Sequence, residues 1–242
     1  MDFTDPADVV PAWMSAAAFL QRNAPRAWAA EMVDDRGIPY RHPPFYVPDS
    51  AYHLPVHAKA EYLAAAEYRR LAAAELYHLD AEATATALAT PVTSSPDITT
   101  LPPAPSGLLT WATPVTTDRG APLVALSWGP EEDGGLMMVW WSDSEAVAHR
   151  SGEDLDAVIN SNGSLTYDRW ARYVPGSRPD HADLRREPYE LDSHVIPAAM
   201  ATWTAMRAGR LRAVETLAPS SGDREQAGRM GLNARPVRCY RP

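Results

Sequence analysis

The chain has 242 residues, 45% hydrophobic and 22% charged, a composition typical of a globular protein with its own core. No apolar run approaches the roughly 18 residues that cross a bilayer, and the acidic start lacks the basic and apolar regions of a secretory signal. The single cysteine, Cys239, excludes an internal disulfide and a cysteine-rich zinc site. We therefore expect a cytoplasmic protein that makes no membrane contact.

Positive charge is concentrated near the carboxyl end. The net charge is −9, but residues 203–242 have a local balance of +5, which leaves −14 on the remainder. An acidic body argues against coating nucleic acid with the whole surface. The segment fits a patch for phosphate, a dock for an acidic partner, or arginines that neutralise the chain's own carboxylates. Its arginines are Arg207, Arg210, Arg212, Arg224, Arg229, Arg235, Arg238 and Arg241.

The first 90 residues are predicted to be helical. Pro11 and Pro25 suit the first turns of two short helices, where the missing N–H costs nothing. Pro55 then begins a long, alanine-rich helix over residues 55–88, whose small residues favour close packing against another helix.

Residues 107–143 predict strands, because short apolar runs at 108–112, 123–128 and 136–141 are joined by turns rich in Asp, Gly and Pro. The third run is apolar on both faces, as in a strand that lies between two layers. Further along, we expect a helix over 144–159, a strand within 164–174, a helix over 197–217 and a final strand in PVRCY.

A stretch rich in Ser, Thr and Pro, residues 90–106, separates the helical part (1–89) from the rest (107–242). A two-domain chain would divide there. We prefer one composite domain over residues 1–242, because the alanine-rich helices alone make a thin core. The expected fold is α+β: an antiparallel three-stranded meander, extended by one or two later strands, with N-terminal and C-terminal helices packed on it.

Two groups of residues are candidates for metal-assisted chemistry. His53 and His57 have a spacing that presents two imidazoles to one metal on a helix, but Pro55 interrupts the helix between them. Asp180, His181, Asp183 and His194 have the side chains that hydrolytic or nuclease sites use, and also occur often in ordinary loops. Neither group forms a complete metal motif.

Nucleotide-binding loops and the G-x-S-x-G frame are absent, so no cofactor is expected. Trp140 and Trp141 are adjacent in a predicted strand and must point to opposite faces, so we expect one of them to be exposed. An exposed tryptophan beside arginines could stack on bases or grip a peptide.

The segments LPPAPSGLL and PLVALSWGP, and the ending R-x-x-x-x-R-M-G-L…PVRCYRP, resemble a family of unknown function from actinobacteria and their phages and plasmids. The resemblance covers roughly residues 101–242. It implies a phage- or plasmid-associated setting and a chain that ends in a helix, an arginine-rich connector and a strand. It implies no catalytic residue.

These observations favour a non-enzymatic binding protein that contacts nucleic acid or an acidic protein. The expected contact surface is formed by Arg207, Arg210, Arg212, Arg224, Arg229, Arg235 and Arg238, with tryptophan edges from Trp140 and Trp141. One alternative is a metal-assisted hydrolase or nuclease that uses His and Asp side chains. The other is a self-assembling structural protein. A homo-oligomer is a further possible partner state.

Overall fold

The computed structural model describes residues 3–40, 47–92, 98–116, 122–132, 134–173 and 195–242. Its helices are α1 (Val9–Arg22), α2 (Ala24–Glu31), α3 (Asp49–Tyr52), α4 (Val56–Ala72), α5 (Ala81–Leu88), α6 (Ser144–Ser151), α7 (Leu155–Asn162), α8 (Val195–Arg207) and α9 (Ser221–Arg229). Its strands are β1 (Glu75–Leu79), β2 (Gly107–Thr116), β3 (Pro122–Pro130), β4 (Leu136–Asp143), β5 (Leu165–Tyr173), β6 (Arg212–Leu217) and β7 (Val237–Arg241). Short 3₁₀ helices lie at Pro6–Asp8 and Ile98–Thr100.

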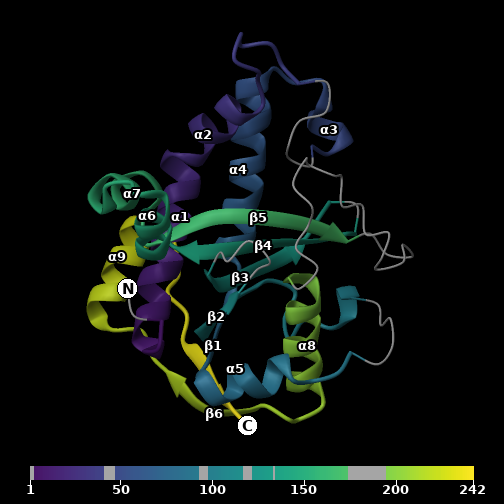
Figure 1. The fold of residues 1–242 in the computed structure, drawn as a ribbon, viewed down its shortest axis with the longest axis vertical. Helices are drawn as coiled ribbons and strands as arrows, with labels where there is room; N and C mark the ends of the chain where they lie inside the picture. The colour runs from purple at the N-terminus through teal and green to yellow at the C-terminus, as the bar shows by residue number, and fades with distance from the viewer. Residues whose placement is uncertain (1–2, 41–46, 93–97, 117–121, 133, 174–194) are drawn as a thin grey trace.

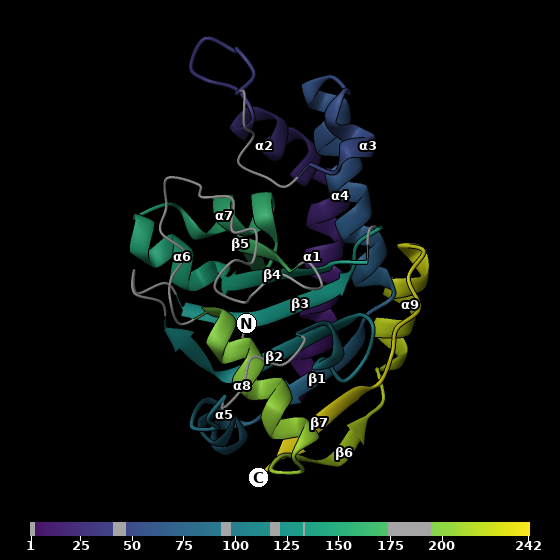
Figure 2. The ribbon, with the colours of Figure 1, turned by 90° about the vertical axis from the view of Figure 1, so that its right-hand side faces the viewer.

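The seven strands of the described residues belong to one mixed sheet, in the order β5-β4-β3-β2-β1-β7-β6 (Figures 1 and 2). Strands β2 to β5 pair antiparallel in sequence order, and β6 pairs antiparallel with β7. Strand β1 runs parallel to both of its neighbours, β2 and β7. The strand from the helical part of the chain therefore joins the central hairpins to the carboxyl-terminal pair.

Helices cover both faces of the sheet and enclose two cores. The upper core lies between the sheet and α1, α2, α4 and α9, and the lower core lies between the sheet and α5 and α8 (Figure 1). Tryptophans dominate the lower core, where Trp128 stacks on Tyr77 and meets Trp203 edge-on. Alanines of α1 and α4 line much of the upper core and let these helices approach closely.

Strand β4 has the two-sided burial that its sequence predicts. Met137, Val139 and Trp141 lie in the upper core. Leu136, Met138 and Trp140 lie in the lower core. A strand covered on both faces has no polar alternation, and for this reason the run LMMVWW reads as continuously apolar.

The predicted helix over 55–88 is wrong, because three elements occupy that stretch. Helix α4 ends near Ala73, the run ELYHL forms β1, and Asp80 then begins α5 by accepting a hydrogen bond from the N–H of Ala83 at 2.8 Å. β1 is buried on both faces between two parallel partners, and this tertiary pairing overrides the helix-forming flanks.

The predicted helix over 197–217 is also wrong beyond Arg207. Helix α8 is followed by Gly209, whose positive φ of 68° ends the helical path, and the chain continues as β6. Leu211 is buried in the lower core, whereas Val214 is 53% exposed on β6. The apparent helical spacing of these residues therefore spans a turn and an edge strand.

The expected α+β class is confirmed, and the sheet is larger and more mixed than expected. The predicted strand within 164–174 and the final strand are present as β5 and β7, and the helix over 144–159 is divided into α6 and α7. Within the described residues, each helix is too short or too polar to cross a bilayer.

Candidate functional site at the carboxyl-terminal sheet edge

The carboxyl-terminal end of the sheet has an open edge. Among the residues that the structure describes, β6 is the last strand of the sheet, with β7 on its inner side and no strand on its outer side. Five of its six residues are exposed and Leu217 is half-buried. In Figure 1 β6 lies at the lower border of the molecule. An exposed edge strand presents backbone N–H and C=O groups that have no strand partner.

The carboxyl-terminal arginines divide into engaged and unengaged groups. Arg238 lies 3.0 Å from Glu75, Arg241 lies 3.4 Å from Asp80, and Arg229 lies 3.8 Å from Glu225. Arg207 donates to the carbonyl of Thr100, and Arg224 donates to that of Pro219 at 2.7 Å. No partner is found within the described residues for the other three, which are Arg210, Arg212 and Arg235.

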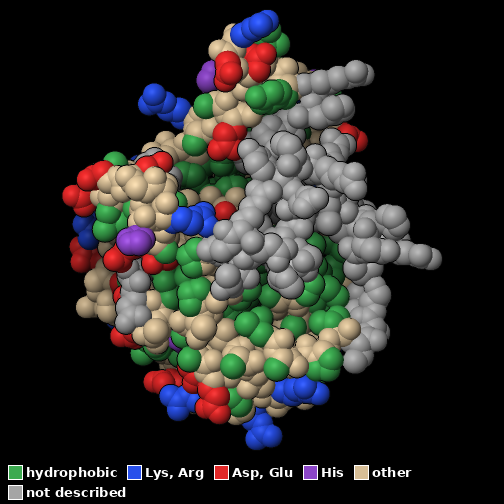
Figure 3. All heavy atoms as spheres, viewed as in Figure 1, with side chains coloured by type: hydrophobic (Ala, Val, Ile, Leu, Met, Phe, Trp, Pro, Cys, Tyr) green, Lys and Arg blue, Asp and Glu red, His purple; other side chains and the backbone are tan. Residues whose placement is uncertain are grey.

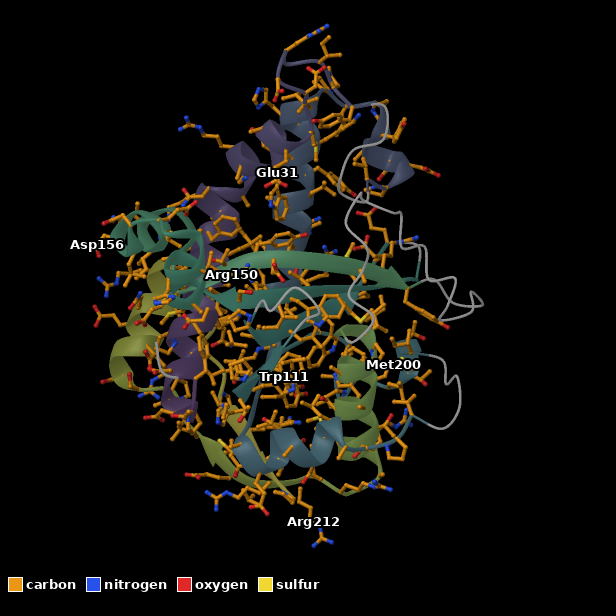
Figure 4. The ribbon with its side chains drawn as sticks, in the orientation of Figure 1. Glu31, Trp111, Arg150, Asp156, Met200 and Arg212 are labelled. Atoms are coloured by element: carbon orange, nitrogen blue, oxygen red, sulfur yellow. The ribbon has the colours of Figure 1, made fainter. Side chains whose placement is uncertain are left out.

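Arg212 is the unengaged arginine that the sheet positions best. It lies directly opposite Arg241 in the β6–β7 ladder, so two guanidinium groups project from neighbouring strands on the same face. Like charges in this arrangement repel, and of these two arginines only Arg241 contacts Asp80. Figure 4 shows the side chain of Arg212 extending away from the body of the protein. The arrangement favours a carboxylate supplied from outside the open edge.

Acidic side chains accompany the arginines at this end. Figure 3 shows blue and red side chains interspersed over the lower end of the molecule. Glu215 lies on β6 itself, and Glu75 and Asp80 lie at the two ends of β1. The segment is therefore a mixed surface with a few unpaired arginines, and not a continuous positive patch.

The expectation that Trp140 or Trp141 is exposed is wrong. Both are fully buried, Trp140 in the lower core and Trp141 in the upper core. The indole of Trp141 donates to the hydroxyl of Ser127 at 3.0 Å. Adjacent residues of a strand do point to opposite faces, but helices cover both faces here. Neither tryptophan contributes to the surface.

The histidine candidates lie at helix ends. His53 follows α3, and His57 lies in the first turn of α4, beyond Pro55. Among the residues that the structure describes, no three His, Cys, Asp or Glu side chains are grouped closely enough to hold a metal ion. The other candidates, Asp180, His181, Asp183 and His194, lie outside the described residues.

A buried charged cluster, formed by Glu67, Arg70 and Glu131, lies between α4 and the β3–β4 turn. Arg70 contacts Glu67 and Glu131, both at 2.6 Å, and the exposed fractions of the three side chains are 12%, 4% and 9%. Ser127 links Glu67 to Trp141, which extends the cluster into the upper core. Sequence reasoning missed it: Glu67 and Arg70 have a visible helical spacing, but Glu131 is distant in the chain.

Burial dominates the electrostatics of this cluster. Burial raises the pKa of Glu131 above its usual value, and the nearby Arg70 offsets only part of that effect. Burial alone would lower the pKa of Arg70, but Glu67 and Glu131 together raise it, so the guanidinium stays charged.

A hollow of about 260 Å³ adjoins the cluster, with polar groups from Tyr62, Arg69, Ser106 and Glu132 on its walls. Tyr62 donates to Glu132 at 2.7 Å, and Arg70 holds both of its carboxylate partners. Tyr62 and Glu132 are therefore paired with each other, and Arg70 is paired with Glu67 and Glu131. The cluster therefore fastens α4 to the β3–β4 turn, which is a structural role.

The comparisons with known proteins add no functional assignment. No protein-family model, curated protein or solved structure matches this chain. Among the described residues, the open edge at β6 combines unpaired backbone groups with arginines that have no described partner.

Proposed function

We propose that this chain is a non-enzymatic interaction protein that captures an extended acidic protein segment along the open edge of β6. The observation that carries the proposal is the combination of an exposed edge strand with an unengaged arginine, Arg212, at its start.

Strand addition supplies the affinity in this mode of recognition. An extended segment laid along β6 would form main-chain hydrogen bonds with the free side of the strand, as peptides do on the sheet edges of known recognition domains. Natural proteins usually protect such edges with short strands, charges or bulges. β6 is short and carries an irregularity beside Val214, which limits indiscriminate pairing and favours a partner of matching register.

Arginine supplies the selectivity for acidic segments. Arg212 faces Arg241 on its inner side, so a carboxylate placed on its outer side would relieve that repulsion. Arg210 is also exposed and lies two residues before β6. Complementary charges at such a surface raise association rates and exclude basic partners. The rest of the chain carries a net negative charge, so it repels an acidic partner from other parts of the surface.

An acidic protein fits this surface better than nucleic acid. Binding to a duplex at physiological salt draws on several phosphate contacts at once, roughly six to ten in well-studied cases. Five of the eight carboxyl-terminal arginines already contact carboxylates or carbonyls of the chain. The tryptophans that would stack on bases are buried.

The metal-assisted hydrolase remains a prediction from the sequence, since its candidates Asp180, His181 and His194 lie outside the described residues. The resemblance to a phage- and plasmid-associated family suggests that the acidic partner belongs to such a system. No feature of the described residues favours catalysis over binding.

Peptide binding measured by fluorescence anisotropy tests the proposal. A labelled peptide of alternating Glu and Val should bind at low ionic strength, and Arg212→Glu should weaken binding roughly tenfold or more. The matched control is Arg150→Glu, an exposed arginine on α6, which lies far from Arg212 in Figure 4. That control should bind like the unmodified protein.

Two further probes separate strand addition from simple charge attraction. The same peptide N-methylated at alternate positions keeps its carboxylates but loses donors for the ladder, so it should bind weakly. A single-stranded oligonucleotide should bind less tightly than the acidic peptide. Equal binding of the methylated peptide, or stronger binding of the oligonucleotide, would contradict the proposal.

A further inference from the structure

Strand β6 carries two opposite charges on one face. In the ladder with β7, Arg212 lies opposite Arg241 and Glu215 lies opposite Cys239. Residues 239 and 241 share a face of β7, so Arg212 and Glu215 also share a face although three positions separate them. The register irregularity between Ala213 and Glu215 puts these two side chains on the same face, because Val214 is an extra residue without a partner in β7.

Both charges are available to a partner. Arg212 and Glu215 are exposed, and neither makes an ion pair or a side-chain hydrogen bond to any residue that the structure describes. The Glu215 carboxylate lies near Cys239: burial, followed by this negative charge, raises the pKa of the thiol.

An antiparallel pair of two β6 strands matches these charges twice. With the two-fold axis between Ala213 and Val214, Arg212 faces Glu215 of the partner subunit, and Glu215 faces Arg212 of the partner subunit. Opposite charges at directly opposed positions stabilise antiparallel pairs. In the same register Ala213 faces the partner's Val214, which covers a side chain that is 53% exposed in the single chain.

The other registers are poorer. Pairing all six residues of the strand would place Arg212 opposite Leu217 of the partner subunit and leave both charges unmatched. Pairing Arg212 with itself would bring two guanidinium groups together. Only the register centred between Ala213 and Val214 pairs Arg212 with Glu215 on both sides of the axis.

We propose that a second copy of this chain occupies the β6 edge and that the two sheets join across a two-fold axis. The inference rests on the proposed function, since it uses the same open edge, and it names the segment that pairs there as β6 of the second copy, in which Glu215 supplies the carboxylate. A two-fold contact of this kind closes on itself, so the assembly stops at a dimer. A short strand pair buries little surface, so the dimer should be weak and concentration-dependent.

Sedimentation of charge-reversed variants tests the pairing. The unmodified chain should show a concentration-dependent dimer at low ionic strength. Arg212→Glu and Glu215→Arg should each weaken it roughly tenfold or more, because each creates like charges at two opposed positions. The combined variant R212E/E215R should restore it, since both pairs are re-formed with reversed sign. The matched control Arg150→Glu should dimerise normally.

The outcomes separate the two proposals. A chain that stays monomeric at high concentration but binds the acidic peptide through Arg212 overturns the dimer and leaves the proposed function standing. A monomer that also ignores the peptide overturns both. A dimer that is insensitive to all three variants forms elsewhere and overturns the β6 pairing. Restoration in R212E/E215R is the result that supports it, because a structural effect of either change would not be reversed by the other.

Discussion

Arg70 and Arg212 carry the same guanidinium group in opposite surroundings. Arg70 lies in the interior between α4 and the β3–β4 turn, with its side chain 12% exposed and two carboxylates at 2.6 Å. Arg212 lies at the open edge of the sheet, exposed, beside another arginine and without a described partner. The guanidinium of Arg70 has its counter-charges within the chain, whereas that of Arg212 has none among the described residues.

The difference separates stability from recognition. A buried charge must be matched inside the protein because its desolvation costs several kcal/mol, so the fold itself selects its partners. An exposed charge remains solvated, adds little to stability, and is free to meet another molecule. Changes at Arg70 should therefore alter folding, and changes at Arg212 should alter association.

Replacement of Arg70 by Ala should have the largest effect. It leaves Glu67 and Glu131 buried without their counter-charge, and we expect a loss of about 3–5 kcal/mol in the free energy of unfolding, measured by urea denaturation. The combined variant R70M/E67L/E131L removes all three charges and should recover most of that loss. A loss below about 1 kcal/mol for Arg70→Ala would mean that water reaches the cluster and that the contrast with Arg212 is false.

Gly129→Ala should have an intermediate effect on stability, because the added Cβ would clash with the side chain of Arg70. A Cβ atom there would lie 2.8 Å from Cγ and 2.9 Å from Cδ of Arg70, and 3.0 Å from the hydroxyl of Ser106. Overpacking of this kind costs about 1–3 kcal/mol. The control is Gly228→Ala on α9, where a Cβ meets nothing within 4 Å and the better helix former should stabilise slightly.

The pH dependence of stability should report the protonation of the buried Glu131 carboxyl. Burial raises the pKa of Glu131 from its ordinary 4.5, so the folded chain holds this proton more tightly than the unfolded chain. Stability from this group is fully present below pH 4.5 and is lost as the pH rises through the raised value. Denaturation of the unmodified chain and of Glu131→Gln, followed from acid upward, should show the advantage of the unmodified chain shrinking.

The opposite result would also be informative. An advantage of the unmodified chain that grows with pH would mean that Arg70 outweighs burial and that the pKa of Glu131 is lowered. The control is Glu225→Gln on α9, where both side chains of the ion pair with Arg229 are exposed and the nearest atoms are 3.8 Å apart, so the change should alter stability little.

The same contrast explains what could be predicted from the sequence. Strands β3 and β4 are visible as apolar runs between Gly-containing turns, because local pattern and final burial agree there. β1 is not visible, because ELYHL follows an alanine-rich helix and becomes a strand only through its parallel neighbours β2 and β7. The break before β6 had a local signal in Gly209, which the helical spacing of the surrounding apolar residues obscured.

For the candidate sites, the sequence shows where charge is concentrated but not how it is used. The cluster of carboxyl-terminal arginines is evident from composition alone. That Arg238 and Arg241 meet Glu75 and Asp80 is not, because β1 and β7 are adjacent only in the folded sheet. The Arg70 cluster was missed for the same reason, since Glu131 comes from the distant β3–β4 turn.

Replacement of Arg212 by Ala should have the smallest effect on stability, below about 0.5 kcal/mol in urea denaturation, because the side chain is exposed and makes no described contact. The change removes a like charge from beside Arg241, so a slight gain in stability is the expected sign. Association should fall in the same variant, measured by sedimentation and by peptide anisotropy. A clear loss of stability without loss of association would mean that Arg212, like Arg70, has a structural role. The reason to regard the β6 edge as a recognition surface would then be lost.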